Sequence, residues 1–563
     1  MPDVQVTIDG HQVSVPANST VLDAAKVAGI DIPELCAHDA LKPIGACRMC
    51  LVEVEKQRVL HPACTFPVSE GMVVHTASDA VLGARRFVLQ LLFSERNHFC
   101  MYCQTSGSCT LQDLAYEHGL THWEFDRAFP KMPVDASRQF FVMDHNRCIL
   151  CRRCIRACDE LVGNRTLGLK NRGADTMVIA DMDIPFGDSS CISCGTCMQM
   201  CPTGALMDRA SAYMGATDEI TRVPSRCSLC SVGCGVELIV RGNRVIRVEG
   251  DWDAEPNKGL ICEVGRFGLL HERRQRVRKP LVKADGALAD ADWDDALQKA
   301  AEGLKSAESA VVVSGFSSTE AAQAAVNQLP GKKMALGGAL VNGDNAPLSV
   351  LDETDLIIVA DVDLTEGYNY RMASFPIKRS ARHRGVRVIL LDDEPNGLDA
   401  WARYKWSPDE AERAVELAQH AEMPVIVYDQ HSAALAQELA AQLPKAKTIG
   451  FAPEGNTAGL AEVGISEPFA NDGFSAYYVI AGEAAEVPQE LMDALAKADF
   501  VAVQASYREP WEDVADVILP SPVMFEKDGS LVNTEGRSFE LKAGVTTRRP
   551  SEVEVIERLG ALL

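Results

Sequence analysis

The chain has 563 residues, of which 47% are hydrophobic and 24% charged, which is ordinary for a globular protein of three or more domains. Its 79 acidic residues outnumber the 55 basic ones, and the net charge of -24 argues against nucleic acid or anionic lipid as a ligand. No run of about 18 apolar residues and no N-terminal signal pattern is present, so we expect a cytoplasmic protein with no membrane span of its own.

Cysteine is concentrated in the first half of the chain. All 19 cysteines lie between Cys36 and Cys262. Because a reducing cytosol disfavours disulfides, cysteine at this density indicates metal binding or catalysis. By spacing, the cysteines fall into five groups, and together with His98 they make twenty donors, or five sets of four.

The first group follows a strand-like segment. Residues 4–16 alternate apolar and polar side chains around the turn at Asp9-Gly10, which predicts a hairpin, and residues 19–30 predict a helix capped by Ser19 or Thr20. Two strands, a helix and a cysteine loop resemble the β-grasp of [2Fe–2S] ferredoxins, here with ten residues in the first gap instead of four. This variant resembles the N-terminal domain of the large iron–sulfur subunit of complex I. The resemblance implies a [2Fe–2S] domain over 1–78 with the ligands Cys36, Cys47, Cys50 and Cys64.

The second group contains three cysteines and lacks a fourth. The nearest additional donor is His98, and His118 or His122 could take its place. The same families carry a [4Fe–4S] cluster held by one histidine and three cysteines, which implies such a domain over 79–119. The histidine stands two residues before the first cysteine, as in the diaphorase subunit of NAD-linked hydrogenases. The implied ligands are His98, Cys100, Cys103 and Cys109.

The third and fourth groups each have the spacing C-x2-C-x2-C-x3-C, which is typical of bacterial ferredoxins with [4Fe–4S] cubanes. In that motif the fourth cysteine of each run binds the other cluster, and two zinc sites are a much less specific alternative. We therefore predict a two-cluster ferredoxin domain over 138–210. One cubane is assigned to Cys148, Cys151, Cys154 and Cys201, and the other to Cys191, Cys194, Cys197 and Cys158.

The fifth group has the spacing C-x2-C-x3-C-x27-C and ends in "NKGLICEVGRFG". It resembles the N-terminal [4Fe–4S] domain of molybdopterin oxidoreductases, which implies a domain over 220–275. Catalytic members usually have a lysine two residues after the last cysteine, where this chain has Val264. The implied ligands are Cys227, Cys230, Cys234 and Cys262.

From residue 276 onwards the pattern changes to α/β. Apolar runs such as 309–316 and 386–394 alternate with helical segments such as 410–421, which predicts a largely parallel, doubly wound sheet. No G-x-G-x-x-G follows any of these strands, so we expect no Rossmann NAD site in this chain, and no P-loop appears either. "ADVILPSPVMFEKDGSLVNTEGR" resembles the molybdopterin oxidoreductase domain. The absence of any cysteine after Cys262 and the short length favour a degenerate, pterin-free domain over 276–563.

Together these motifs resemble the large iron–sulfur subunits of complex I and of NAD-linked formate dehydrogenases and hydrogenases. The fold class is therefore expected to be multidomain α+β and α/β. The resemblance implies one [2Fe–2S] and four [4Fe–4S] clusters, no molybdopterin and no catalytic residue in this chain.

The chain would serve as the electron-transfer subunit of an oxidoreductase. The implied partners are an FMN-containing flavoprotein that binds NAD(P), a small [2Fe–2S] thioredoxin-like subunit, and a hydrogenase, formate dehydrogenase or bifurcating module. Three alternatives remain: a catalytic formate dehydrogenase subunit with molybdopterin, the large iron–sulfur (G-type) subunit of respiratory complex I itself, and a zinc-rich scaffold.

Overall fold

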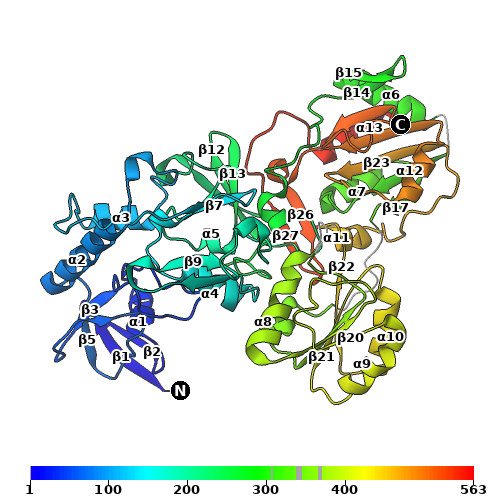
Figure 1. Cartoon of the computed structure of the whole chain (residues 1–563). Coiled ribbons are helices and arrows are strands. Elements are labelled where there is room, and N and C mark those ends of the chain that lie inside the picture. The colour runs from blue at the N-terminus through cyan, green and yellow to red at the C-terminus, as the bar shows by residue number, and fades with distance from the viewer. Residues whose placement is uncertain (1, 306–307, 338–344, 366–369) are drawn as a thin grey trace. The chain divides into compact units, whose positions relative to one another are not determined.

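A computed structural model describes residues 2–305, 308–337, 345–365 and 370–563 (Figure 1). The chain forms two compact units, Met1–Ile220 and Thr221–Leu563. In the ranges described, no helix is both long enough and apolar enough to cross a membrane.

The first unit begins with the expected β-grasp. Its five-stranded sheet has the order β2-β1-β5-β3-β4, with β1 and β2 forming a hairpin and β5 lying parallel to β1. Helix α1 begins after Thr20, whose hydroxyl accepts a hydrogen bond from the backbone N–H of Asp23. The elements are β1 (Asp3–Ile8), β2 (His11–Pro16), α1 (Val21–Val27), β3 (Leu51–Val54), β4 (His61–Pro62) and β5 (Met72–His75).

Helices dominate the next segment. The Ser78 hydroxyl caps α2 (Asp79–Glu95). The buried Arg85 of this helix donates hydrogen bonds of 3.1 Å to the carbonyls of Met49 and Leu51, which fixes the helix against the β-grasp. The short helix η1 (Cys100–Tyr102) and α3 (Thr110–Glu117) follow.

The rest of the first unit is built from short elements. Strand β7 pairs antiparallel with β6 and β10, and β8 pairs with β9, while the short helices α4 and α5 lie within the cysteine runs. These elements are β6 (Val134–Asp135), β7 (Phe141–Asp144), η2 (His145–Arg147), α4 (Arg153–Arg156), η3 (Ala157–Leu161), β8 (Leu167–Lys170), η4 (Gly173–Asp175), β9 (Met177–Ala180), η5 (Phe186–Asp188), α5 (Thr196–Gln199), β10 (Leu206–Asp208) and η6 (Thr217–Glu219).

The second unit opens with a three-stranded antiparallel sheet and then forms the expected α/β layers, but its strands are divided between two sheets. The larger has the order β15-β14-β25-β24-β23-β16-β17, and the smaller has the order β20-β19-β18-β21-β22. The smaller sheet is inserted between β17 and β23, and β23 then returns to pair with β16. The single doubly wound sheet of the sequence prediction is thus two sheets of mainly parallel strands.

The strands of the second unit have the following bounds: β11 (Thr221–Arg226), β12 (Gly235–Arg241), β13 (Arg244–Gly250), β14 (Leu281–Ala284), β15 (Ala287–Asp290), β16 (Ser309–Val313), β17 (Lys332–Ala335), β18 (Leu356–Ala360), β19 (Arg387–Leu391), β20 (Tyr404–Trp406), β21 (Pro424–Asp429), β22 (Lys447–Phe451), β23 (Ala476–Gly482), β24 (Phe500–Ala505), β25 (Val517–Pro520), β26 (Gly529–Val532) and β27 (Ser538–Leu541). Strands β26 and β27 pair with each other.

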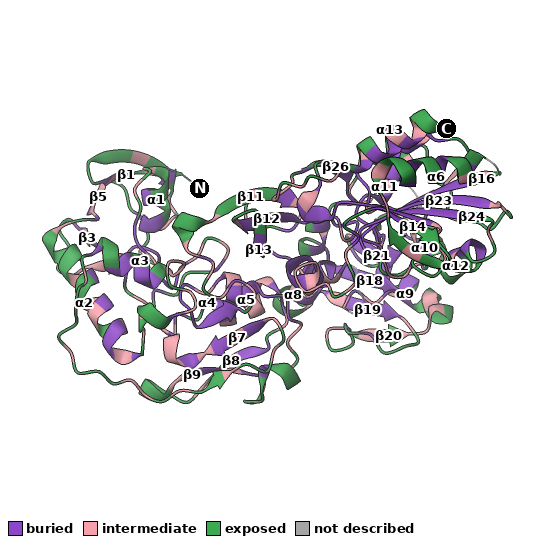
Figure 2. Ribbon diagram, turned by 90° about the horizontal axis from the view of Figure 1, so that it is seen from above, coloured by how far each residue is buried: buried purple, intermediate pink, exposed green. Residues whose placement is uncertain are grey.

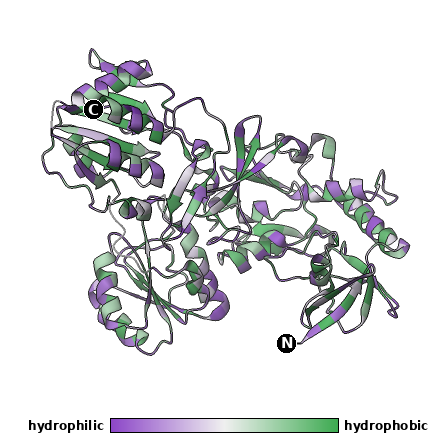
Figure 3. Ribbon diagram, turned by 180° about the vertical axis from the view of Figure 1, so that it is seen from behind, coloured by the Kyte–Doolittle hydropathy of each residue, from purple (hydrophilic) through white to green (hydrophobic). Residues whose placement is uncertain are grey.

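Helices cover both faces of the larger sheet. Alanines and leucines of α6, α7 and α13 pack on one face, and α12 packs on the other. The central strands are buried throughout (Figure 2) and hydrophobic (Figure 3), as expected for parallel strands covered on both sides.

The helices of the second unit have the following bounds: η7 (Val264–Gly268), α6 (Trp293–Lys305), α7 (Thr319–Gln328), η8 (Leu348–Asp352), η9 (Arg371–Ala373), α8 (Ser374–Arg384), η10 (Pro408–Glu410), α9 (Ala411–Ala418), α10 (Ala433–Gln442), α11 (Thr457–Glu462), α12 (Gln489–Leu495), η11 (Met524–Glu526) and α13 (Glu552–Leu562).

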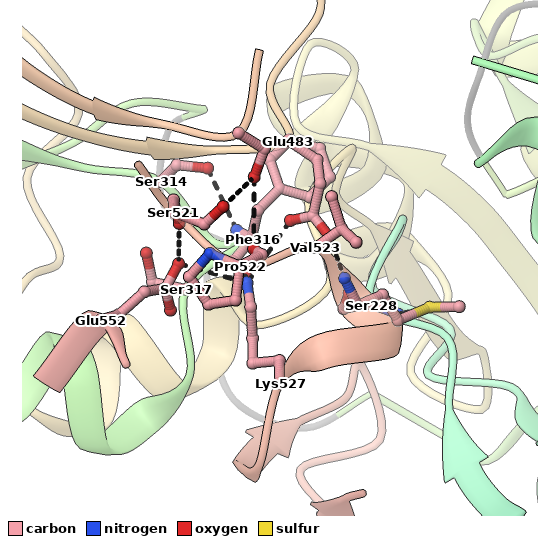
Figure 4. Close-up of polar contacts among 12 residues, drawn as sticks. Ser228, Ser314, Phe316, Ser317, Glu483, Ser521, Pro522, Val523, Lys527 and Glu552 are labelled. Carbon is pink, nitrogen blue, oxygen red and sulfur yellow. Dashed lines mark hydrogen bonds and ion pairs between the residues drawn. The ribbon is translucent and has the colours of Figure 1, made fainter. Parts of the chain in front are cut away.

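A buried charge network joins the carboxyl ends of the strands in the larger sheet (Figure 4). The Lys527 side chain is 3% exposed, and its Nζ lies 3.4 Å from Glu483 Oε2 and 3.2 Å from Glu552 Oε1. The same Nζ donates a hydrogen bond of 2.7 Å to the carbonyl of Phe316, and the Ser521 hydroxyl donates one of 2.7 Å to Glu552 Oε1. This network connects the ends of β16, β23 and β25 to α13.

Replacing Lys527 by methionine should destabilise the second unit by about 3–5 kcal/mol, because two buried carboxylates lose their cation. Urea unfolding of the full chain, followed by tryptophan fluorescence, measures this change, since every tryptophan except Trp123 lies in the second unit. Lys299→Met, on an exposed position of α6, is the control. Equal midpoints for the two variants would contradict the prediction.

Candidate metal centres

The first group of cysteines gathers in the loops beside β3 and β4. Cys36, Cys50 and Cys64 are buried, and Cys47 is partly buried. Hydrogen bonds from the thiols of Cys47 and Cys64 lower the pKa of Cys36, and a hydrogen bond from Cys64 lowers the pKa of Cys50. The backbone N–H of Cys47 also points at the Cys36 sulfur, at 3.4 Å. All four sulfur atoms therefore meet at one place.

The second group lines one cavity with four side chains: His98, Cys100, Cys103 and Cys109. His98 Nε2 is buried and has no hydrogen-bond partner within the described residues, and burial together with Arg147 and Arg96 lowers the His98 pKa to about 4. A neutral imidazole with an unused nitrogen suits a metal ligand. Of the other two candidates, neither His118 nor His122 lines this cavity.

The third and fourth groups line two further cavities. Each cavity takes three cysteines from one run and the last cysteine from the other run. One contains Cys148, Cys151, Cys154 and Cys201. The other contains Cys158, Cys191, Cys194 and Cys197.

The two runs share a backbone geometry that turns their sulfur atoms inward. Leu150 and Ser193 each follow a first cysteine by two positions, and both have positive φ, of 54° and 53°. Arg152 and Gly195, two residues further on, are also left-handed and lead into α4 and α5. The backbone N–H groups of Leu150 and Ser193 point at the preceding cysteine sulfur at 3.4 Å. Such N–H···S contacts stabilise a thiolate.

The fifth group lies at the start of the second unit. Cys227, Cys230 and Cys234 are buried, and the Cys227 N–H donates to the Cys234 carbonyl at 2.8 Å, which closes the loop. A side-chain carbon added at Gly265 would lie 3.4 Å from the Cys227 sulfur and 3.9 Å from the Cys262 sulfur. The last cysteine is therefore brought back to the loop despite the long gap.

Most of these thiols would be protonated on their own. Burial raises the pKa of Cys148 to about 11 and the pKa values of Cys151, Cys158 and Cys230 to about 12, and nearby cysteines contribute to the increase at all four. A cationic metal centre would offset this cost, so binding would release protons. Among the residues described, no three or more His, Cys, Asp or Glu side chains form a group that could hold a metal ion. Each of the three cavities in the first unit is instead lined by four of the expected donors, which is the number that a [4Fe–4S] cluster needs.

Sequence reasoning missed a set of threonine hydroxyls close to the sulfur atoms. The pattern C-x-T occurs at Cys103, Cys194 and Cys201. In each case the threonine Oγ1 lies near the cysteine sulfur, at 3.2, 3.5 and 3.7 Å respectively. The repeated C-x-T was the available signal, and hydrogen bonding around the sulfurs is one of the factors that tune cluster potentials.

Comparison with protein families gives five matches along the chain. Residues 2–79 match a 2Fe-2S iron-sulfur cluster binding domain, and 85–123 match the NADH-ubiquinone oxidoreductase-G iron-sulfur binding region. Residues 139–207 match the ferredoxin-like domain of NADH-quinone oxidoreductase subunit 3. Residues 220–273 match the molybdopterin oxidoreductase Fe4S4 domain, and 430–549 match molybdopterin oxidoreductase.

Individual relatives agree with these matches. The second G-type subunit of the NADH-quinone oxidoreductase of Rhizobium meliloti is 33% identical over 71% of this chain and 49% of its own length. Subunit 3 of the Thermus thermophilus enzyme is 29% identical over 99% of this chain and 81% of its own. The alpha subunit of the NADPH-Fe(3+) oxidoreductase of Geobacter sulfurreducens is 34% identical over 56% of this chain and 37% of its own length. The chain thus spans about half the length of the first relative.

Among solved structures, a chain of an NAD+-reducing [NiFe]-hydrogenase is 36% identical over 38% of this chain and 89% of its own, with a TM-score of 0.36. The folds and the cluster-binding matches together define an iron–sulfur component of an oxidoreductase. More specifically, its matches and relatives make the chain similar to the large iron–sulfur subunits of NADH-quinone oxidoreductases, such as the Rhizobium and Thermus proteins.

The crossed arrangement of the two ferredoxin runs can be tested with two double variants. If Cys148 and Cys201 serve one cluster, C148A/C201A should lose about four irons, since only one [4Fe–4S] cluster is affected. C148A/C158A should lose about eight irons, because these residues line different cavities. Iron is measured per chain after anaerobic purification, and a reversed ranking of the two variants would show that the runs are not crossed.

Proposed function

We propose that this chain is a multi-cluster electron-transfer subunit of an NADH- or NADPH-linked oxidoreductase. The observation that carries the proposal is that three cavities in the first unit are each lined by one complete set of four expected donors. When bound, iron–sulfur clusters exchange single electrons at potentials that the protein sets.

The chain's own residues would bind and position five clusters. The first cysteine group takes one [2Fe–2S] centre, and the other four groups, one of them completed by His98, each take one [4Fe–4S] centre. The boundaries we propose for the five domains are 1–78, 79–119, 138–210, 220–275 and 276–563. Burial of the sulfur atoms and N–H donors such as those of Leu150 and Ser193 would then tune the potentials.

The chemistry at NAD(P) would take place on partners. We propose an FMN-containing flavoprotein that oxidises NADH or NADPH, a small [2Fe–2S] thioredoxin-like subunit, and a further redox subunit. Support comes from the relatives, which are subunits of NADH-quinone oxidoreductases and of an NADPH-Fe(3+) oxidoreductase. The third partner would be a hydrogenase, a formate dehydrogenase or a bifurcating module.

The second unit is proposed to carry no molybdopterin. Ligands of open α/β sheets bind at the carboxyl ends of the strands. In the smaller sheet those ends carry Asp361, Asp392 and Asp429, and burial together with these carboxylates and Asp393 raises the pKa of Asp361. A group with phosphates would be repelled there. In the larger sheet the same ends are filled by the Lys527 network (Figure 4).

Metal analysis of the anaerobically purified chain tests this proposal. We expect about 18 irons per chain, from one [2Fe–2S] and four [4Fe–4S] clusters, and neither molybdenum nor tungsten. The isolated chain should also fail to reduce a dye with NADH or formate. One molybdenum or tungsten per chain with formate activity would identify a catalytic formate dehydrogenase subunit instead, and zinc in place of iron would identify a scaffold.

A further inference from the structure

One arginine of the ferredoxin domain connects directly to the ligand loop of the first cysteine group. Arg156 lies between Cys154 and Cys158, and its side chain lines neither of the two ferredoxin cavities. The residue is 8% exposed. Its two terminal nitrogens donate hydrogen bonds to the carbonyls of Cys36 and Lys42.

Further polar contacts join the same two domains beside Arg156. Arg153 Nη2 lies 3.7 Å from Glu34 Oε1, and the Lys42 N–H donates to Glu160 Oε2 at 3.1 Å. Residues 153, 156 and 160 are spaced to share one face of the helical segment. That face therefore meets the loop 34–42 through charged and hydrogen-bonding groups on both sides.

The charge of the Arg156 guanidinium bears on the electrostatics of the first cysteine group. An arginine remains protonated under all ordinary conditions, so Arg156 places a fixed positive charge against the carbonyl of a cysteine that we assign to the [2Fe–2S] centre. Reduction adds a negative charge to a centre, and a nearby buried cation stabilises the reduced form. Solvent and salt screen the electrostatic interactions of the exposed charges on this acidic chain. The interactions of a buried charge are screened much less.

We propose that Arg156 is a positioning residue that fixes the [2Fe–2S] loop on the ferredoxin helix and raises the reduction potential of the [2Fe–2S] centre. The inference rests on the proposed function, since it requires that the first cysteine group holds this centre. The same side chain ties the first group to a helix whose cysteines belong to two different cavities, so one residue would set both the spacing and the potential at this junction.

The test is a redox titration of the full chain, with the [2Fe–2S] signal followed by electron paramagnetic resonance. In R156Q we expect the signal to be retained but to titrate at a lower potential. The equilibrium constant for reduction should fall about tenfold, which is 59 mV for one electron. R156K, which keeps the charge, should restore most of the difference. R165Q removes an equal charge from an exposed position of the same domain and should leave the potential unchanged.

The outcomes separate the two proposals. If the wild-type chain has no [2Fe–2S] signal, the proposed function fails first. If the signal is present and R156Q shifts no more than R165Q, or R156K shifts as far as R156Q, the role of Arg156 is overturned. If R156Q is isolated without the signal, R156K decides: a signal at the wild-type potential supports the proposal, and a lost signal shows that Arg156 is only structural and overturns it.

Discussion

Most of the buried thiols in the ferredoxin runs would keep their protons unless a cationic centre takes the proton's place, and the first unit depends on this constraint. Burial holds the pKa of Cys148 near 11 and the pKa values of Cys151 and Cys158 near 12. The helices α4 and α5 have four residues each, too few to persist without tertiary support. Metal binding would therefore ionise the ligands and order the segments that carry them, so that folding and cluster assembly are coupled.

Each ferredoxin cavity takes cysteines from both runs. The coupling between folding and cluster assembly would therefore extend from single loops to the whole ferredoxin domain. Each cavity needs Cys158 or Cys201 from the other run, so neither run completes its site alone. The neighbouring segments are also joined by buried arginines, in addition to an apolar cluster that α2 and α3 share with the β-grasp loops. Arg85 holds α2 against the β-grasp, and Arg96 donates to the carbonyls of His145 and Thr176 in the ferredoxin domain. Arginine suits this role because its planar fork reaches two carbonyls at once.

The alternation of residues 4–16 allowed the β-grasp hairpin to be predicted, because a hairpin follows from local sequence, and the spacing of the cysteines likewise predicts the donor sets. The division of the α/β layers into two sheets was not predictable in this way. A buried apolar run such as 356–360 indicates a strand but does not indicate its neighbours, and β23 pairs with β16 across a complete inserted sheet. Arg156 and Lys527 were also missed, since charged residues in polar segments give no sign of burial until the tertiary contacts are known.

We propose a role for the second unit that needs no active site. The loop of the fifth cysteine group is held by segments from distant parts of the α/β layers. The Ala452 N–H donates to the Ser231 hydroxyl at 2.8 Å, and the Gly455 N–H donates to the Ser228 carbonyl at 3.1 Å. Asn533 donates to the Val232 carbonyl at 3.2 Å. Because these contacts bury the cysteines, a domain of this fold would house a cluster whether or not its strand ends hold a cofactor.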